Sequence, residues 1–288
     1  PVPLLFNGRF SKLLDDVIPD VVFFNKSGGW NKFSDLIPTP RVKQIRRIVS
    51  VEHYHPPEFP IRLKQPFRTV RNLPYSRFQA YCLDAIVCLS PAARDIVTNR
   101  KYSYPKNRVH VIPNGIDTTH FQFSVPLRER TRKAIGAKSE TVVLYCGRLS
   151  REKAPDLLLK AWASLPSEKS AEMLLLIVGG GPMMAELQEA AYQMCAEYKV
   201  QFAGFKQDIL PYLCASDIFV LPSREECCPL ALLEAMAVGR YSIATRVAGT
   251  QGIITDSEKG TLVEPDSSAQ LAEAILEAAE DPLYRQHV

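Results

Sequence analysis

The second half of the chain alternates short apolar runs with longer stretches in which apolar residues recur at helical spacing. Short apolar runs that end in glycine, proline or a charged residue are typical of buried parallel strands, and the stretches between them of amphipathic helices. The expected strands are 141–147, 174–181, 200–204, 217–223, 241–246 and 260–265, and the expected helices 154–165, 183–194 and 230–239. This alternation predicts an α/β domain built on a doubly wound parallel sheet.

The first half repeats the alternation less regularly, with strands expected at 20–25, 47–53, 85–90 and 108–115. Pro-rich and basic stretches interrupt these strands, an Asn-Gly turn ends the last one, and a polar segment follows it. We therefore expect an N-terminal domain at 1–120, a linker at 121–139 and a C-terminal domain at 140–288.

Composition narrows the class of protein. The 288 residues are 46% hydrophobic and 23% charged, which suits a globular protein of two domains. No apolar run approaches the roughly 20 residues that span a bilayer, and the first residues lack the charged start and apolar core typical of a signal sequence, so a secreted or membrane-spanning protein is not expected. The seven cysteines lack paired CxxC spacing, and several lie within apolar runs, which favours reduced thiols and a cytoplasmic location.

Charge is unevenly distributed along the chain. Residues 1–120 hold 18 Lys and Arg against 9 Asp and Glu, whereas the remainder holds 17 against 22. A basic half can bind nucleic acid, anionic lipid or acidic substrates, or can simply be a solvated surface. Zinc-finger spacing and aromatic RNA-binding signatures are absent from the sequence, so nucleic acid is not expected as a partner.

The carboxyl ends of the expected strands carry the candidate chemistry, because parallel sheets bind ligands where the strand order reverses. Gly147 ends one strand, and Arg148 and Lys153 precede the helix that follows. Glycine permits close approach of a ligand to the backbone, and two cations beside a helix start suit phosphate oxygens. Two surface cations without a ligand are the alternative interpretation.

The run "LLIVGGGPMMAEL" invites a dinucleotide-binding interpretation, which fails in part. The G-x-G-x-x-G pattern would require glycine at position 184, where the chain has Met184. This departure disfavours a nicotinamide-dependent dehydrogenase. The glycines from Gly179 to Gly181 can form a tight turn between a strand and a helix, or can let a nucleotide lie against the backbone.

The stretch "PSREECCPLALLEAMAVG" places two carboxylates, Glu226 and Glu234, on either side of a Cys-Cys-Pro corner. Pro229 suits a first helical turn, and the backbone N–H groups of Leu230 and Ala231 are then open to an anion. Glu234 follows about one turn later and can lean back toward the helix start. Both acids could be ordinary helix charges. Next to cations and glycines, however, they complete the set of groups that a nucleotide sugar needs.

Five segments together carry a family resemblance: "VIPNGIDTTHF", "VLYCGRLSREKAPDLLLKAW", "LLIVGGGPMMAEL", "VQFAGFKQDILPYLCASDIFVLPSREECCPLALLEAMAVG" and "GTLVEPDSSAQLAEAI". In order, spacing and residue type they resemble the retaining nucleotide-sugar glycosyltransferases of family four. The resemblance implies the GT-B fold, in which two Rossmann-like domains face a cleft. It also implies transfer of a sugar from a nucleoside-diphosphate-sugar to a hydroxyl of a glycan, lipid-linked or small acceptor, with retention and without a metal or cofactor.

The resemblance also implies roles for individual residues. Glu226 would contact the hydroxyls of the donor sugar and Glu234 those of the ribose, while Arg148 and Lys153 match the family's cationic pair on the diphosphate. His53 fits a catalytic histidine that the family often has, with His55 as the fallback. The implied catalytic residues are His53, Glu226, Arg148 and Lys153. The implied donor-binding residues are Gly147, Arg148, Lys153, Gly180, Gly204, Phe205, Lys206, Glu226, Cys227, Cys228, Leu230, Ala231 and Glu234.

The resemblance has two departures. The chain begins after the family's first strand and glycine-rich loop, and it stops before the family's last helical stretch, so we expect an incomplete N-terminal domain. A GT-B protein that binds nucleotide or a partner without catalysis is the alternative function. Because family members often act on lipid-linked acceptors, the basic first half is also expected to contact an anionic membrane surface peripherally. The donor base, the sugar and the acceptor stay open.

Overall fold

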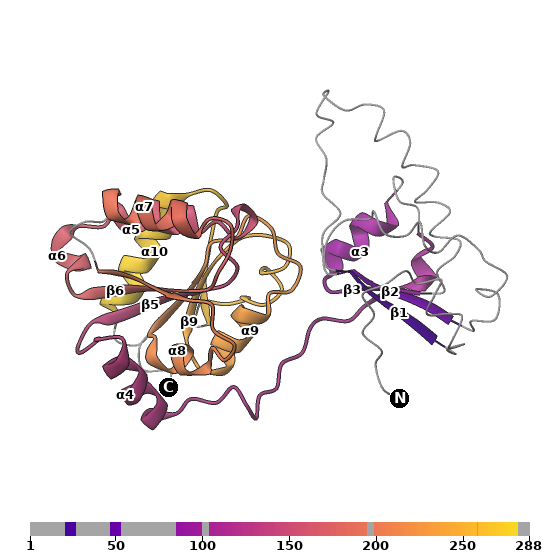
Figure 1. The fold of residues 1–288 in the computed structure, drawn as a ribbon. Helices are drawn as coiled ribbons and strands as arrows, with labels where there is room; N and C mark the ends of the chain where they lie inside the picture. The colour runs from indigo at the N-terminus through magenta and orange to yellow at the C-terminus, as the bar shows by residue number, and fades with distance from the viewer. Residues whose placement is uncertain are drawn as a thin grey trace. The chain divides into compact units, whose positions relative to one another are not determined.

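The computed structural model describes the backbone of 21–26 and 47–52 and residues 85–99, 104–194, 199–257 and 259–281. The chain divides into two compact units, Pro1–Pro113 and Asn114–Val288. Figure 1 shows the elements of each unit, coloured along the chain. The segment 121–139, expected to be a linker, lies in the second unit and contains a helix.

The first unit contains a four-stranded parallel sheet in the order β1-β2-β3-β4. Its elements are β1 (Val21–Lys26), β2 (Arg47–Glu52), β3 (Ala85–Cys88), α3 (Pro91–Thr98), the short 3-10 helix η3 (Lys106–Arg108) and β4 (Val109–Val111). Helix α3 begins where the Ser90 side chain accepts a hydrogen bond from the Ala93 N–H, with Pro91 in the first turn. Strands β2, β3 and β4 fall within the segments that the sequence predicts, and β1 extends one residue beyond its predicted segment, to Lys26.

The second unit is built on a six-stranded parallel sheet in the order β10-β9-β8-β5-β6-β7. Its strands are β5 (Thr141–Cys146), β6 (Met173–Val178), β7 (Val200–Gly204), β8 (Ile218–Leu221), β9 (Tyr241–Thr245) and β10 (Gly260–Val263). The chain starts in the middle with β5, moves outward to β7, and returns to place β8 on the other side of β5. Strand order therefore reverses between β5 and β8. This doubly wound parallel sheet confirms the predicted fold class.

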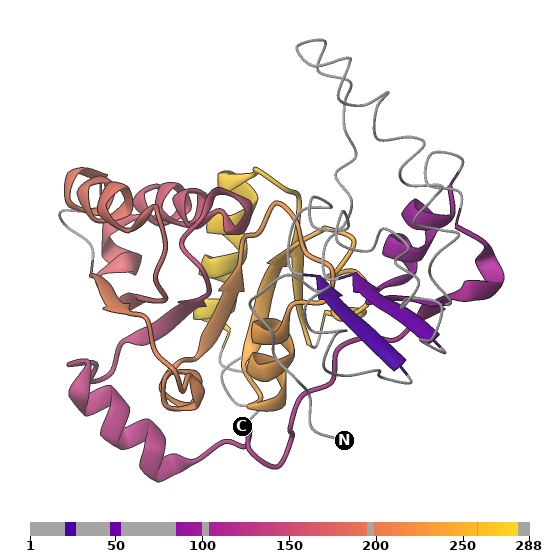
Figure 2. The same ribbon diagram turned by 45° about the vertical axis from the view of Figure 1, so that its right-hand side comes forward.

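Helices cover both faces of this sheet, as Figures 1 and 2 show. They are α4 (Val125–Ala134), the 3-10 helix η4 (Arg151–Lys153), α5 (Pro155–Ala163), α6 (Ser167–Ser170), α7 (Met184–Met194), α8 (Leu210–Ala215), α9 (Leu230–Ala237) and α10 (Ser268–Glu280). Helices α5, α7 and α10 pack on one face around the fully buried Trp162. Helices α4, α8 and α9 pack on the other face around Phe219. Apolar residues on both faces explain why β5, β6, β8 and β9 are buried along their whole length.

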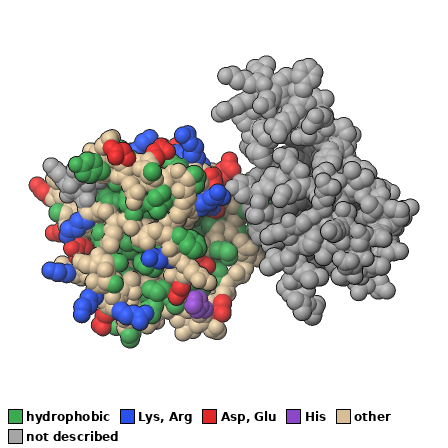
Figure 3. Space-filling view, viewed as in Figure 1, with side chains coloured by type: hydrophobic (Ala, Val, Ile, Leu, Met, Phe, Trp, Pro, Cys, Tyr) green, Lys and Arg blue, Asp and Glu red, His purple; other side chains and the backbone are tan. Residues whose placement is uncertain are grey.

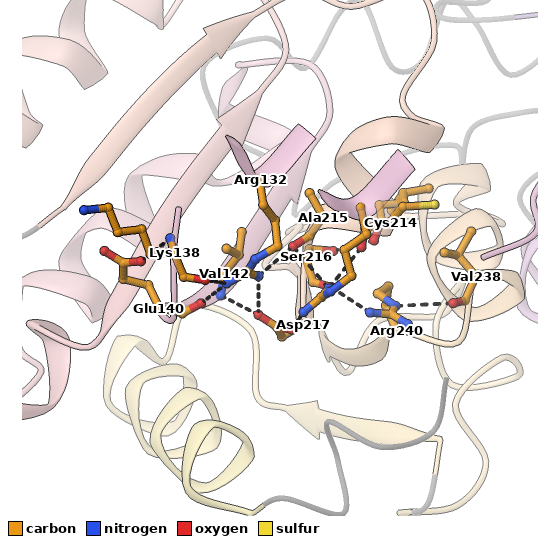
Figure 4. A network of polar contacts seen from close by, with 12 residues as sticks. Arg132, Lys138, Glu140, Val142, Cys214, Ala215, Ser216, Asp217, Val238 and Arg240 are labelled. Atoms are coloured by element: carbon orange, nitrogen blue, oxygen red, sulfur yellow. Dashed lines mark hydrogen bonds and ion pairs between the residues drawn. The ribbon is translucent and has the colours of Figure 1, made fainter. Parts of the chain in front are cut away.

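Helix α4 is tied to the edge of the sheet where β5 and β8 begin, which we call the amino edge. Arg132 Nη1 donates to Asp217 Oδ2 at 3.2 Å and to the Ala215 carbonyl at 3.0 Å. The other oxygen of Asp217 accepts from Arg128, and Asp217 Oδ2 also accepts from the Val142 N–H at 2.7 Å. Figure 4 shows Arg132 and Asp217 within this network. The arginines thus fix the polar helix α4 to the domain core.

A third arginine, Arg240, lies in the same network, directly before β9. Its Nη1 donates to the Ser216 carbonyl at 2.7 Å, and its guanidinium lies 4.8 Å from the ring centroid of Phe123. Burial, followed by the nearby charge of Arg128, lowers the pKa of Arg240 to about 10. The side chain is still protonated at neutral pH.

One face of the second unit mixes charged and apolar side chains. On the face seen in Figure 3, Lys and Arg side chains are scattered among Asp and Glu, with apolar side chains between them. Within the described ranges, every helix is too short or too polar to cross a bilayer.

Candidate functional site

The carboxyl ends of β5 and β8 bring the two most informative sequence motifs together. Strand order reverses between these strands, and doubly wound sheets generally bind ligands at the carboxyl ends of the strands at such a point. The loop after β5 contains Arg148 and Lys153, and the loop after β8 contains Glu226. We call this side of the sheet the carboxyl edge.

Lys153 and Glu226 form an ion pair across this edge. Lys153 Nζ lies 2.6 Å from Glu226 Oε1, although 73 residues separate them in the sequence. The Glu226 side chain is 6% exposed and that of Lys153 is 28% exposed, so the carboxylate is the more deeply placed partner. The cation is therefore on the solvent side, where a larger anion can reach it.

Three further residues hold the Glu226 loop from behind. The buried Ser223 hydroxyl donates to Glu226 Oε1 at 2.7 Å, and Thr245 at the end of β9 donates to the Ser223 carbonyl. Gly249 backs onto the same loop: a Cβ there would lie 2.5 Å from the carbonyl carbons of Glu226 and Cys227. Only glycine lets the chain after β9 approach the Glu226–Cys227 peptide this closely.

The Cys228 end of the loop is held from the start of the second unit. Asn114 Nδ2 donates to the Cys228 carbonyl at 2.8 Å. In the sequence, Asn114 is recognisable only as part of an Asn-Gly turn, and no pattern identifies Ser223, Thr245 or Gly249 as support for the site. The Asn-Gly pair was the one visible signal, because the other contacts depend on chain segments that meet only in the folded sheet.

Helix α9 begins directly after this loop. Pro229 is extended, with φ −70° and ψ 116°, and precedes the helix instead of occupying its first turn. Pro229 supplies no side-chain cap, so the N–H groups of the first turn, including those of Leu230 and Ala231, have no capping side chain. Leu230 is exposed and Ala231 half-buried. A helix start of this kind favours an anionic ligand.

Glu234 lies one turn into α9 and is half-buried. Burial raises its pKa, and the charge of His120 partly opposes this rise. Burial, followed by the charge of Glu234, raises the pKa of Cys146 at the end of β5 to about 12, so this thiol stays protonated. The effect of its charge on Cys146 indicates that the Glu234 carboxylate lies near the carboxyl end of β5.

The loop after β5 is positively charged. Arg148 is exposed, while its carbonyl accepts from the Tyr145 hydroxyl at 2.8 Å. Partial burial alone would raise the pKa of Glu152, yet a hydrogen bond from Ser150 and the charges of Arg148 and Lys153 lower it. The loop ends at Ala154, which takes a left-handed conformation with φ 49° before α5 begins.

The glycine turn after β6 packs against the turn after β5. A Cβ at Gly179 would overlap the Gly147 carbonyl oxygen, and one at Gly181 would overlap the backbone of Leu149. Gly179 has φ 149°, a conformation that favours glycine. These two glycines are therefore needed for packing within the edge, whereas a Cβ at Gly180 would make an ordinary contact with the Phe205 Cβ, at 3.5 Å.

The turn after β7 supplies an exposed aromatic side chain. Gly204 has φ 71°, Phe205 is 77% exposed, and Lys206 Nζ lies 5.9 Å from the centroid of the Tyr212 ring. An exposed aromatic ring beside a glycine turn can stack on a planar base. Phe205 thus borders the carboxyl edge on the side of β6 and β7.

Two of the predicted residues cannot be placed at this edge. His53 and its fallback His55 are outside the described residues. Among the residues that are described, no group of three or more His, Cys, Asp or Glu is placed to hold a metal ion. The carboxyl edge thus has positive charge at Arg148, Lys153 and the start of α9, and carboxylates at Glu226 and Glu234.

Family comparisons agree with these motifs. Residues 128–288 match the sequence model of the family described as glycosyl transferases group 1, and residues 1–120 match that of glycosyltransferase family 4.

Two relatives illustrate the level of similarity. An uncharacterised glycosyltransferase of Methanocaldococcus jannaschii is 31% identical over 192 residues, which are 65% of this chain and 49% of that protein. The Escherichia coli UDP-Gal:α-D-GlcNAc-diphosphoundecaprenol α-1,3-galactosyltransferase is 29% identical over 208 residues, or 71% and 53% of the two chains. The chain thus spans about half the length of these curated relatives.

Solved structures with the same fold include Anabaena HepE in complex with UDP, with a TM-score of 0.79 at 20% identity over 96% of this chain and 73% of that one. WaaG, a glycosyltransferase involved in lipopolysaccharide biosynthesis, has a TM-score of 0.69 at 22% identity over 89% and 73% of the two chains. These likenesses confirm the predicted fold class.

Proposed function

Because the chain belongs to the glycosyl transferases group 1 family, we propose that it transfers a sugar from a UDP-sugar to an acceptor hydroxyl. The observation that carries the proposal is the Lys153–Glu226 pair, with Nζ and Oε1 2.6 Å apart at the reversal of strand order. A cation for the diphosphate and a carboxylate for the sugar hydroxyls are thus adjacent. A nucleotide-sugar donor, which contains both groups, requires this arrangement. The proposed transfer retains the anomeric configuration, which the resemblance to family four supports.

The roles of the charged groups follow from the reaction. The bond between the anomeric carbon and the diphosphate oxygen breaks with its electron pair on the diphosphate, and the acceptor oxygen forms the new bond to that carbon. Lys153, Arg148 and the start of α9 stabilise the negative charge of the leaving group, which is the work of an electrostatic catalyst. The acceptor proton passes to the departing phosphate. No metal is required in this scheme.

The carboxylates orient the donor. Glu226, held by Ser223, accepts hydrogen bonds from hydroxyls of the transferred sugar, beside the backbone of Cys227 and Cys228. Glu234 accepts from the ribose hydroxyls, which are neutral and so do not repel its charge. When the diphosphate binds, Lys153 exchanges part of its contact with Glu226 for the phosphate oxygens, and this frees Glu226 for the sugar.

Uracil is the proposed base. HepE has been solved with UDP and with UDP-glucose, and the E. coli relative is named for UDP-Gal. In this chain the base would lie against Gly180 and the turn Gly204, Phe205 and Lys206, where the exposed Phe205 ring offers a stacking surface.

A glycan or a lipid-linked molecule is the proposed acceptor. The acceptor in the name of the E. coli relative is a diphosphoundecaprenol, and residues 1–120 of this chain have nine more Lys and Arg than Asp and Glu. A cytoplasmic protein with such a surface would bind an anionic membrane by about 1 kcal/mol per well-placed cation. Vesicles that contain anionic lipid should therefore retain the chain at low salt, and equal retention by neutral vesicles would count against this contact.

A titration of the full chain with UDP, GDP and ADP tests the donor site. UDP should raise the melting temperature and bind with a measurable Kd. Lys153→Ala should weaken UDP binding and lower turnover of UDP-sugars by about 10²–10³-fold, because it removes a preorganised cation from the leaving group.

Lys169→Ala is the matched control, since it also removes one lysine ion pair, that of Lys169 Nζ with Glu280 Oε1 at 2.7 Å, at a position outside the carboxyl edge. The control should bind UDP as the wild type does. Equal UDP binding by Lys153→Ala and the wild type would exclude this donor site. UDP binding without sugar transfer or hydrolysis would support the alternative function, a protein of the same fold that binds nucleotide without catalysis.

A further inference from the structure

One side chain, that of Arg224, joins the loops that follow three strands of the carboxyl edge. Arg224 lies in the loop after β8, two residues before Glu226. Its backbone N–H donates to the Glu152 carbonyl at 2.8 Å, which connects its loop to the loop after β5. Its side chain also reaches Asp266 in the loop after β10. No pattern in the sequence indicates a role for this arginine.

All three guanidinium nitrogens of Arg224 are used. Nη1 and Nη2 form a forked contact with the two carboxylate oxygens of Asp156, at 3.1 and 3.0 Å. Nη1 also donates to the Arg151 carbonyl at 2.6 Å, and Nε donates to Asp266 Oδ1 at 2.7 Å. A lysine at this position could keep the charge but could not reproduce the planar fork.

The Arg224 guanidinium and the Asp156 carboxylate are both charged at neutral pH. Burial alone would raise the pKa of Asp156, but the hydrogen bond and the charge of Arg224 outweigh burial and lower it. The hydrogen bond to Asp156 is the main reason that the pKa of Arg224 is raised. Asp266 has φ 58°, a left-handed conformation that few residues other than glycine and asparagine or aspartate adopt. The Arg224 contact holds Asp266 in that turn.

These loops carry the two members of the central ion pair. Lys153 directly follows Glu152, whose carbonyl accepts from the Arg224 N–H, and Glu226 follows two residues after Arg224. The fork to Asp156 holds the start of α5, immediately beyond Lys153. Arg224 therefore spans the backbone segments whose separation sets the distance between Lys153 Nζ and Glu226 Oε1.

We propose that Arg224 is a positioning residue that fixes the spacing of Lys153 and Glu226 for a nucleotide-sugar donor without touching the donor itself. The donor rests on the proposed function, whereas the ordering of the two loops by Arg224 does not. Its charge is already matched by Asp156 and Asp266, so Arg224 acts through geometry.

Arg224→Lys tests the proposal, with Arg128→Lys as the matched control. Each arginine makes four side-chain hydrogen bonds within the described residues, Arg224 at the carboxyl edge and Arg128 at the amino edge. Two quantities are measured on the full chain well below the melting temperature: amide hydrogen exchange without ligand, and the Kd for UDP.

Arg224→Lys should speed amide exchange in 147–156 and 222–229 by about tenfold, because local opening becomes easier there. It should also weaken UDP binding about tenfold, since small misplacements of binding groups are costly. Arg128→Lys should lower the melting temperature yet leave both quantities at the wild-type values. Asp156→Asn, which keeps the shape of the partner but removes its charge, should change exchange in the same two segments.

Unchanged exchange in Arg224→Lys, or UDP binding that falls equally in both lysine variants, would overturn the positioning role. The second result would reduce Arg224 to a general stabiliser. If the wild type binds no UDP, the proposed function is wrong, and so is the part of the inference that concerns the donor. The exchange measurement still decides, in that case, whether Arg224 orders the two loops.

Discussion

The amino edge and the carboxyl edge of the six-stranded sheet use the same kinds of charged side chain with different results. At the amino edge, Arg128 and Arg132 contact Asp217 and the carbonyls of 214–216 at the end of α8. At the carboxyl edge, Lys153 contacts Glu226 beside the start of α9, and Arg148 is exposed. The first set of cations is satisfied within the chain, and the second set leaves positive charge available.

Helix direction explains the difference. In a parallel α/β sheet each helix runs opposite to the strands, so helix ends with free carbonyls gather at the amino edge and helix starts with free N–H groups at the carboxyl edge. Arginine at a helix end completes its hydrogen bonding, whereas cations near a helix start add to a positive field. One edge is thereby suited to hold the domain together and the other to bind an anion.

Asp217→Ala, at the amino edge, should have the largest effect on the free energy of unfolding. It removes the carboxylate that both Arg128 and Arg132 contact and that the Val142 N–H donates to, which leaves buried donors unpaired. The free energy of unfolding should fall by about 3–5 kcal/mol, as for other broken buried ion pairs. Urea unfolding measures the loss, and UDP titration of the folded protein should show an unchanged Kd.

Asp256→Ala is the control for this change. Asp256 forms an exposed ion pair with Lys259, with Oδ2 and Nζ 2.7 Å apart, and its loss should cost less than about 1 kcal/mol. Similar losses of unfolding free energy in the two variants would contradict the stabilising role of the amino edge. A weaker UDP affinity in Asp217→Ala alone would show that the amino edge also contributes to anion binding.

Gly249→Ala should affect the carboxyl edge by an intermediate amount. Its Cβ would lie 2.5 Å from backbone atoms of Glu226 and Cys227, which cannot move aside as a flexible side chain can. We expect a loss of about 1–3 kcal/mol in the free energy of unfolding together with weaker UDP binding. Gly252→Ala is the control in the same loop, because its Cβ would meet nothing within 4 Å. A stable Gly249→Ala protein with normal UDP affinity would contradict the close packing of Gly249 against the Glu226–Cys227 peptide.

Glu234→Gln should have the smallest effect on stability, and in the opposite direction. Burial raises the pKa of Glu234 in the folded protein, so its ionisation disfavours the folded state as the pH rises through that pKa. The variant should gain less than about 1 kcal/mol at pH 7, because solvent screens this half-buried group. The gain should vanish below about pH 4, where the carboxyl is protonated in the folded and the unfolded wild type.

Urea unfolding of Glu234→Gln between pH 3.5 and 7 measures how the gain in stability depends on pH. UDP titration measures the effect of the same substitution on nucleotide affinity. The proposed ribose contact predicts UDP binding about tenfold weaker, because a charged acceptor is lost. A variant that is less stable than the wild type at pH 7, or that binds UDP equally well, would contradict the assignment of Glu234 to the carboxyl edge.

Apolar runs made much of the fold predictable. The strands at 141–147 and 217–223 are recognisable because sheets covered on both faces need continuous apolar residues, and Leu230–Ala237 is recognisable by its leucines and alanines. Helix α4 was hidden because its sequence, VPLRERTRKA, is mostly polar. It is held in place by arginine contacts to Asp217 and the end of α8, and these have no signature in the sequence.

The candidate site was predictable to the extent that each motif carries its own chemistry. Lys153 and Glu226 were each expected at the ends of strands, and the order of the strands places them in contact. The positions of Asn114, Gly249 and Arg224 could not be derived in the same way. Their contacts join segments that are far apart in the chain, and no local pattern indicates which carbonyl or carboxylate a side chain will meet.

The contacts of Arg224 also have a consequence for the order in which the domain is completed. Arg224 reaches back to Arg151 and forward to Asp266, so its network closes only after β10, one of the last strands of the chain, has joined the sheet. A chain that has folded as far as β9 would have the lysine and the glutamate but not the full set of loop contacts. Non-local contacts of this kind form late because their loop-closure entropy must be overcome first. Tight binding of a nucleotide would then report on a finished molecule, and an immobilised nucleotide would separate completed chains from those arrested one strand short.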